Sequence, residues 1–136
     1  MHHLESAPTF RQLPLFFKRQ LAARLRRVVI LPGKCIVREG DKFNTTYFIH
    51  EGEVEKWYTD SSGDMHITSV LHTNSYFGCV SGLFVDVGFQ FSYYSRTVVD
   101  LVFLNLMQWE DLLEGYPDIK DLIYASTKRM RKFTVS

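Results

Sequence analysis

The pattern of hydrophobic and polar positions changes its period twice along the chain. From Gln12 to Val29, apolar residues recur at helical spacing with basic residues between them, which predicts an amphipathic, basic helix. The apolar positions are Leu15, Phe16, Leu21, Ala22 and Leu25, and the basic ones are Lys18, Arg19, Arg24, Arg26 and Arg27. Pro32-Gly33 then ends the apolar run that precedes it, because proline lacks a backbone donor and glycine accepts turn dihedrals.

From Lys34 to about Leu106 the chain consists of short β-branched and aromatic runs separated by turn residues, which predicts strands. The clearest runs lie at 35–37, 46–49, 54–58, 66–71 and 97–104. Several short strands at nearly even spacing favour a β-sandwich or a barrel-like roll. The turn residues from Ser61 to Asp64 predict a β-hairpin between the runs on either side of them.

After Asn105 the helical period returns. One predicted helix ends at Gly115-Tyr116-Pro117, and its apolar face consists of Met107, Trp109, Leu112 and Leu113. In a last predicted helix, Ile119, Leu122, Ile123, Met130 and Phe133 lie near one face, and the end from Lys128 to Lys132 is basic. The order helix, strands, helix, helix predicts a mainly β domain with flanking helices.

Composition narrows the class of protein. A length of 136 residues with 46% hydrophobic residues fits one compact domain. The 16 basic and 15 acidic residues nearly cancel, so we expect no nucleic-acid partner. Cys35 and Cys79 lack CxxC spacing, which argues against a disulfide framework or a zinc site and favours a cytosolic compartment. No run approaches the roughly 20 apolar residues that cross a bilayer, so we expect a soluble chain, either complete or cut from a longer protein.

The segment 31–57 carries a family resemblance in the order of its motifs. A turn at Pro32-Gly33 is followed by a strand, then by Glu39-Gly40-Asp41, Tyr47-Phe48-Ile49 and Gly52. This order strongly resembles the first half of the cyclic-nucleotide-binding domain family. Tyr76-Phe77-Gly78 is similar to the start of the family's phosphate-binding cassette, and the segment 109–117 is similar to its B helix. The resemblance covers about Phe10 to Ile123 and is closest to the cyclic-nucleotide-gated and hyperpolarization-activated cation channels.

The resemblance implies a fold and a function. The fold is a double-stranded β-helix, an eight-stranded jelly-roll-like β-roll. The implied division is an N-terminal helical segment at 1–27, the roll at 28–106, and the B and C helices at 107–136. The function is that of a regulatory domain of a potassium or other voltage-gated cation channel subunit, in which sensing of cAMP or cGMP is coupled to gating. Such a domain lies on the cytoplasmic side of the plasma membrane, in a tetrameric parent protein whose other subunits are its partners.

The implied ligand pocket is degenerate at the two side chains that matter most. Where the family places a glutamate on the ribose, this chain has Cys79, whose thiol is a weak acceptor. The family's phosphate-binding arginine aligns near Phe89 or Gln90, because the alternative, Arg96, leaves no sequence for the strand before the B helix. The candidate pocket residues are Phe77, Gly78, Cys79, Val80, Ser81, Phe89, Gln90, Phe91 and Ser92.

Two hypotheses therefore stay open. In the first, cAMP or cGMP binds as a weak ligand and no cofactor is required. In the second, the domain is a ligand-free interaction module whose groove is filled by its own bulky side chains, namely Phe84, Phe89, Phe91, Tyr93 and Tyr94. Neither hypothesis involves catalysis or a bound metal. The chain contains no GxSxG, Walker or HExxH motif, so we expect no enzyme. The histidines His50, His66 and His72 have no metal-ligand spacing.

Overall fold

The computed structural model describes residues 3–4, 8–42, 44–78, 88–123 and 125. Two helices, α2 (Pro8–Arg11) and α3 (Leu15–Ala22), precede the strands, and α4 (Leu106–Glu114) follows them. The strands are β1 (Arg26–Ile30), β2 (Cys35–Val37), β3 (Thr45–Glu51), β4 (Val54–Thr59), β5 (Met65–Leu71), β6 (Tyr76–Gly78), β7 (Ser92–Ser95) and β8 (Val99–Asn105). Residues 117–123 are again helical.

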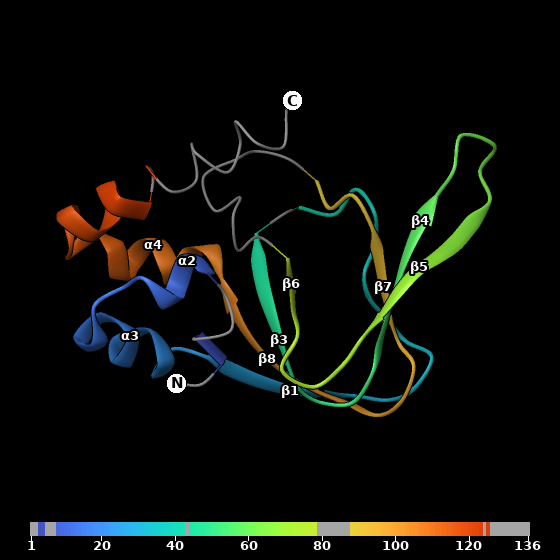
Figure 1. The fold of residues 1–136 in the computed structure, drawn as a ribbon, viewed down its shortest axis with the longest axis horizontal. Coiled ribbons are helices and arrows are strands. Elements are labelled where there is room, and N and C mark those ends of the chain that lie inside the picture. The colour runs from blue at the N-terminus through green and yellow to red at the C-terminus, as the bar shows by residue number, and fades with distance from the viewer. Residues whose placement is uncertain (1–2, 5–7, 43, 79–87, 124, 126–136) are drawn as a thin grey trace.

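The eight strands form two antiparallel sheets. Sheet A has the strand order β1-β8-β3-β6, and sheet B has the order β2-β7-β4-β5. The two sheets face each other, and the helices cover the side of sheet A that points away from sheet B (Figure 1). This arrangement confirms the predicted mainly β roll with flanking helices. Among the described residues, none of the helices is long and apolar enough to cross a membrane.

The central strands of sheet A pack against hydrophobic clusters on both faces. In the central pair of strands, Phe48 of β3 and Leu104 of β8 belong to a hydrophobic cluster with the helices. Ile49 and Leu101, which lie directly opposite each other in β3 and β8, belong to a second cluster inside the roll. Because consecutive side chains of a strand point to opposite faces, a single alternating pattern supplies both clusters.

The helical cluster is built around Trp109, which is fully buried. The rings of Phe10 and Phe17 meet the Trp109 ring edge-on, with centroid distances of 5.2 and 5.9 Å. Asn105 starts α4 with a capping box, because its side chain accepts a hydrogen bond from the Gln108 N–H at 2.9 Å and its own N–H donates to the Gln108 side chain at 3.2 Å. The strand β8 therefore continues directly into α4, the helix that contains Trp109.

One residue predicted to lie on the apolar face of α4 lies on its exposed side. Met107 is 75% exposed, whereas Leu112 and Leu113 are buried with Trp109. In the helical segment that follows, Ile119 and Ile123 are buried and Leu122 is 42% exposed. The predicted positions Met130 and Phe133 and the basic stretch 128–132 lie outside the described residues.

The predicted helix from Gln12 to Val29 is wrong in its second half. The helix α3 ends at Ala22, and the run from Arg26 to Ile30 forms β1, which pairs with β8. The β-branched residues of this run favour a strand, and pairing with a neighbouring strand outweighs the weak helical pattern. Within α3, Phe17 and Leu21 are buried, while Leu15 and Phe16, both predicted to be on the apolar face, are more than half exposed.

The strand predictions were correct at five places and missed two short strands in addition to β1. The runs at 35–37, 46–49, 54–58, 66–71 and 97–104 correspond to β2, β3, β4, β5 and β8. The short strands β6 and β7 were not among the predicted runs. The predicted hairpin between β4 and β5 is confirmed, and the Asp60 side chain closes it by accepting hydrogen bonds from the N–H groups of Ser62 and Asp64, both at 2.9 Å.

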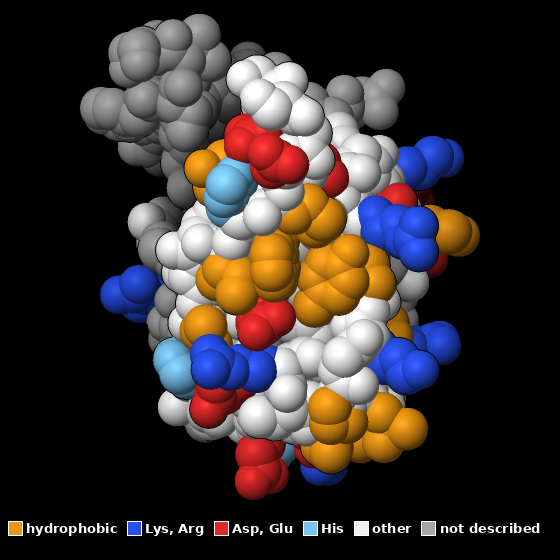
Figure 2. Space-filling view, turned by 90° about the vertical axis from the view of Figure 1, so that its right-hand side faces the viewer, with side chains coloured by type: hydrophobic (Ala, Val, Ile, Leu, Met, Phe, Trp, Pro, Cys, Tyr) orange, Lys and Arg blue, Asp and Glu red, His pale blue; other side chains and the backbone are white. Residues whose placement is uncertain are grey.

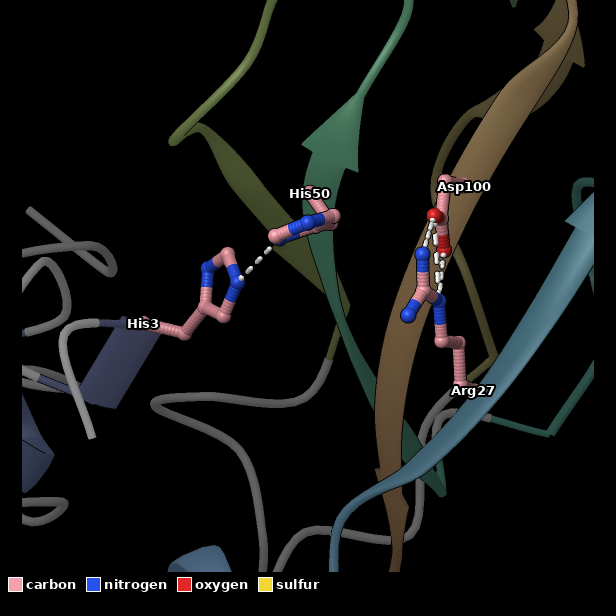
Figure 3. Close-up of polar contacts among 4 residues, drawn as sticks. All are labelled: His3, Arg27, His50 and Asp100. Atoms are coloured by element: carbon pink, nitrogen blue, oxygen red, sulfur yellow. Dashed lines mark hydrogen bonds and ion pairs between the residues drawn. The ribbon is translucent and has the colours of Figure 1, made fainter.

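Two polar contacts lie on the outward side of sheet A, beside the helical cluster (Figure 3). The Arg27 guanidinium donates hydrogen bonds to both carboxylate oxygens of Asp100, with Nε 2.8 Å from Oδ1 and 3.0 Å from Oδ2. The hydrogen bond and the charge of Arg27 lower the pKa of Asp100. His3 contacts His50 of β3 through Nε2 and Nδ1 at 3.2 Å. These contacts attach the edge strand β1 and the N-terminal residues to the two central strands.

Removal of the Trp109 ring should destabilise the fold strongly. We expect Trp109→Ala to lower the free energy of unfolding by about 3–5 kcal/mol, since it leaves a cavity between the helices and sheet A. Urea denaturation followed by circular dichroism measures this change. The matched control is Met107→Ala on the same helix, whose side chain is exposed. A loss of similar size in both variants would contradict the assignment of Trp109 to the core.

The Arg27–Asp100 pair should make stability depend on pH in the acid range. Because the folded pKa of Asp100 lies below its unfolded value, the pair stabilises the fold above about pH 4, and this contribution is lost as the pH falls through the folded pKa. We expect the stability difference between the wild type and Asp100→Asn to be constant near neutral pH and to shrink below about pH 4. Denaturation curves at several pH values measure it. The variant Asp118→Asn, which removes an exposed carboxylate elsewhere, controls for net charge.

Candidate functional site

The space between the two sheets is occupied by a stack of aromatic rings. Phe77 of β6 lies between Tyr47 of β3 and Tyr93 of β7. The Phe77 and Tyr93 rings stack with centroids 4.3 Å apart, and the Tyr47 and Phe77 rings stack at 4.9 Å. Tyr93 belongs to sheet B and the other two residues to sheet A, so the stack joins the sheets across the roll.

This stack is well shielded from solvent. Phe77 and Tyr93 are 5% and 6% exposed, and Phe89, whose ring meets Tyr93 edge-on at 6.2 Å, is 5% exposed. Burial raises the pKa of Tyr93 to about 12, so this residue enters the stack as a neutral phenol. The hypothesis that Phe89 and Tyr93 fill the inside of the roll therefore agrees with their positions.

The segment that leads into β7 is fixed by backbone hydrogen bonds to the loop after β2. The Gly40 N–H donates to the Phe89 carbonyl at 2.8 Å, and the Phe89 N–H donates to the Asp41 carbonyl at 2.8 Å. A Cβ atom on Gly88 would lie 3.0 Å from the Gly40 carbonyl oxygen, so a larger residue here would require the backbone to shift by a few tenths of an ångström. Phe89 points into the roll, whereas Gln90 is exposed. No arginine or lysine occupies these two positions.

Gly78 is also required by close packing. It ends β6 with a φ of +107°, and a Cβ atom there would lie 2.2 Å from the Thr45 carbonyl oxygen of β3. The glycine thus lets the chain leave sheet A close to β3. The next candidate pocket residues, Cys79, Val80 and Ser81, lie outside the described residues, and so does Phe84.

Ser92 serves the scaffold. Its hydroxyl oxygen accepts a hydrogen bond from the Glu39 N–H at 2.9 Å, and its side chain is nearly fully buried. Ser95, three residues further along β7, accepts from the Lys34 N–H at 2.9 Å and donates to the Leu31 carbonyl. Both hydroxyls hold the segments around β2 against β7. In this structure the Ser92 hydroxyl is therefore engaged with backbone.

The structure places a cation beside the candidate pocket that sequence reasoning missed. Lys56 of β4 lies with its Nζ 4.0 Å from the centroid of the Phe91 ring. Phe91 is partly buried against the inner cluster, next to Tyr93. The strand register reveals the position of Lys56, because Lys56 and Tyr93 lie opposite each other in β4 and β7. Sequence alone does not give that pairing.

Arg96 lies away from the inner cluster. It follows β7, its N–H donates to the Glu53 carbonyl at 2.9 Å, and its Nε lies 3.7 Å from Glu53 Oε2. Its side chain is 53% exposed. This position agrees with the register that rejected Arg96 as the phosphate-binding arginine.

Tyr94 was predicted to fill the groove, and this prediction is wrong. Tyr94 neighbours Tyr93 in β7 and therefore points to the opposite, outer face of sheet B, where its ring meets Trp57 edge-on at 6.3 Å. Figure 2, which looks onto that side of the molecule, shows hydrophobic side chains gathered over the sheet. Ile67, which lies opposite Trp57 in β5, is 47% exposed.

Metal-ligating side chains do not cluster in the part of the chain that the structure describes. No group of three or more histidine, cysteine, aspartate or glutamate side chains that could hold a metal ion occurs there. His50 contacts His3, and His66 contacts Asp60 with its Nε2 2.7 Å from Oδ2. The shift of Asp60 to a lower pKa comes chiefly from that hydrogen bond.

Comparison with known proteins points in the same direction as the fold. A cAMP-dependent protein kinase regulatory subunit of Blastocladiella emersonii is 31% identical over 75 residues, which cover 55% of this chain and 19% of that protein. The potassium channel GORK of Arabidopsis thaliana is 25% identical over 114 residues, which cover 84% of this chain and 14% of the channel. The chain thus spans less than a fifth of the length of either relative.

Solved structures share the fold. The N-terminal domain of a transcriptional regulator from Streptomyces coelicolor A3(2) superposes with a TM-score of 0.81 at 22% identity, covering 97% of this chain and 94% of that one. The family model described as cyclic nucleotide-binding domain matches residues 27–116, more than half of the chain. The chain therefore belongs to the cyclic nucleotide-binding domain family.

Proposed function

We propose that this chain is a regulatory domain of a cation channel subunit, in which weak binding of cAMP or cGMP is coupled to gating. The observation that carries the proposal is the similarity to the potassium channel GORK, which extends over 84% of the chain, across both the helices and the roll. In this proposal the domain lies on the cytoplasmic side of the plasma membrane, in a tetrameric parent protein, and its role is regulatory and not catalytic.

Weak affinity follows from the charges of the proposed pocket. Its residues are Phe77, Gly78, Cys79, Val80, Ser81, Phe89, Gln90, Phe91 and Ser92. A cyclic phosphate carries one negative charge, and neither Phe89 nor Gln90 can supply the positive charge of an arginine. Loss of a charge-assisted contact of this kind costs about 1.5–3 kcal/mol, which is roughly a tenfold to a hundredfold loss in affinity.

Coupling between pocket and helices is built into sheet A. Tyr47 stacks on Phe77 of the proposed pocket, while Phe48 on the opposite face packs in the helical cluster with Trp109. The helix α4 begins directly after β8, so a shift of this strand displaces the start of α4. A ligand can shift this equilibrium only by its difference in affinity for the two arrangements.

The proposal is tested by using Trp109 as a reporter of the helices. The chain has two tryptophans, so Trp57→Phe leaves Trp109 as the sole indole. We expect titration of this variant with cAMP or cGMP to change the Trp109 emission in a saturable way, because the ring is buried between α4 and its neighbours. Adenosine and guanosine, which lack the phosphate, serve as controls. An emission that stays constant up to millimolar cyclic nucleotide would contradict coupled binding.

A second candidate function is favoured by the aromatic stack. Tyr47, Phe77 and Tyr93 stack across the inside of the roll, and in this candidate the domain is an interaction module that holds its helices in one arrangement. In this case assembly with other subunits, and not a nucleotide, is the regulated step. The same roll and helical cluster would be used by a nucleotide-sensing domain and by an interaction module.

Removal of one ring from the stack separates these two candidates. We expect Tyr93→Ala to lower the free energy of unfolding by about 3 kcal/mol through the cavity it leaves, which urea denaturation measures. If the stack acts as an internal filler, the same variant binds cyclic nucleotide more tightly than the wild type in calorimetric titration. The matched control is Tyr94→Ala, the neighbouring residue on the outer face. An affinity equal to or below that of the wild type would contradict the filler.

A further inference from the structure

Strand register places the Lys56 side chain on the inner face of sheet B. Lys56 lies directly opposite Tyr93 of β7 and Ser69 of β5 in the antiparallel ladder. Residues that face each other in such a ladder have their side chains on the same side of the sheet. Because Tyr93 stacks on Phe77 across the roll, this side is the interior. Lys56 is therefore directed toward the pocket proposed above.

The surroundings of Lys56 are aromatic. Its ammonium lies 4.0 Å from the centroid of the Phe91 ring, and the residue is partly buried. Within the strands of sheet B it is the only lysine or arginine. Among the residues that the structure describes, no carboxylate forms an ion pair with it. The Lys56 ammonium thus contacts the Phe91 ring.

A ring satisfies an ammonium only in part. Cation–π attraction orients the charge over the ring face, but the three N–H donors of a lysine still favour anionic acceptors. Partial burial against aromatic side chains removes some of the water that would otherwise solvate the charge, which makes an anion more favourable at this place. A ligand that carries one negative charge is therefore a better partner for Lys56 than a neutral one.

Phe89 and Phe91 lie in the segment where the family resemblance implies a phosphate-binding arginine. Neither Phe89 nor Gln90 carries a positive charge. Phe91 comes two residues after Phe89, directly before β7, and the Lys56 ammonium lies over its ring. The positive charge in this part of the roll therefore belongs to Lys56 of β4 and not to a residue of the segment 88–92.

We propose that Lys56 is the residue that binds the anionic group of the cyclic nucleotide in this chain, a cyclic phosphodiester with a single negative charge. This inference rests on the proposed nucleotide-binding function and assigns its charged contact. The Phe91 ring holds the ammonium in place, while the phosphate accepts hydrogen bonds from its free N–H donors. The contact is a single flexible cation, so the affinity stays well below that of a bidentate arginine site.

The test is calorimetric titration of the chain at low ionic strength with cAMP, cGMP, adenosine and guanosine. Lys56→Met keeps most of the side-chain length and removes the charge. We expect it to weaken binding of cAMP and cGMP by about tenfold or more, whereas binding of the uncharged nucleosides changes by less than about twofold. Lys56→Arg retains the charge and should restore most of the affinity for both cyclic nucleotides. Added salt should weaken cyclic nucleotide binding in the wild type more than in Lys56→Met.

The matched control is Arg96→Met, which removes one positive charge from the same region of sheet B outside the roll. It should leave all four affinities unchanged, so an equal loss in Arg96→Met and Lys56→Met would overturn the inference. Equal losses for cyclic nucleotides and nucleosides in Lys56→Met would overturn it as well, because they indicate packing and not charge. Thermal unfolding shows whether each variant is folded, and Lys56→Gln replaces Lys56→Met if the latter is not.

Failure of the inference and failure of the proposed function give different results. Saturable binding of cAMP or cGMP by the wild type that is unaffected in Lys56→Met overturns the role of Lys56 alone. Absence of heat with either cyclic nucleotide at millimolar concentration in the wild type overturns the nucleotide-binding function and the role of Lys56 together.

Discussion

The pairing of β3 with β8 is the interaction on which the rest of this structure depends. These two strands form the centre of sheet A, and each contributes side chains to a hydrophobic cluster on both of its faces. One cluster seats the helices around Trp109, and the other fills the roll around Ile49 and Leu101. A register shift of one residue between the strands would send each set of side chains to the wrong face. The fold is therefore fixed by one strand pair.

The inside of the roll combines the fold of the family with a dense packing of aromatic rings. The glycines at 78 and 88 permit close backbone approaches to Thr45 and Gly40. Aromatic rings lie close to them, and the arginine that the family resemblance implies would fall near Phe89 or Gln90. Dense aromatic packing stabilises the roll through burial and ring contacts, so the fold does not require a bound ligand for its cohesion.

Much of the fold could be predicted from the sequence because its signals are local. The β-branched and aromatic run from Thr46 to Ile49 and the turn at Ser61 to Asp64 predicted β3 and the hairpin correctly. The strand β1 was missed because Arg26 to Ile30 is compatible with either period, and only its pairing with β8 decides. The candidate site was harder. The inward position of Lys56 and the outward position of Tyr94 follow from register across β4 and β7, which no local pattern contains.

The neighbouring positions of Tyr47 and Phe48 restrict how this domain can change over time. Tyr47 packs in the ring stack and Phe48 contacts Phe10 on the far side of the same strand. A smaller residue at 47 leaves a void that the strand closes only by tilting, and that tilt withdraws Phe48 from its contacts. Substitutions that empty the interior are therefore expected to destabilise the fold whether or not a nucleotide binds. A lineage that loses its ligand is expected to keep bulky rings in the vacated space.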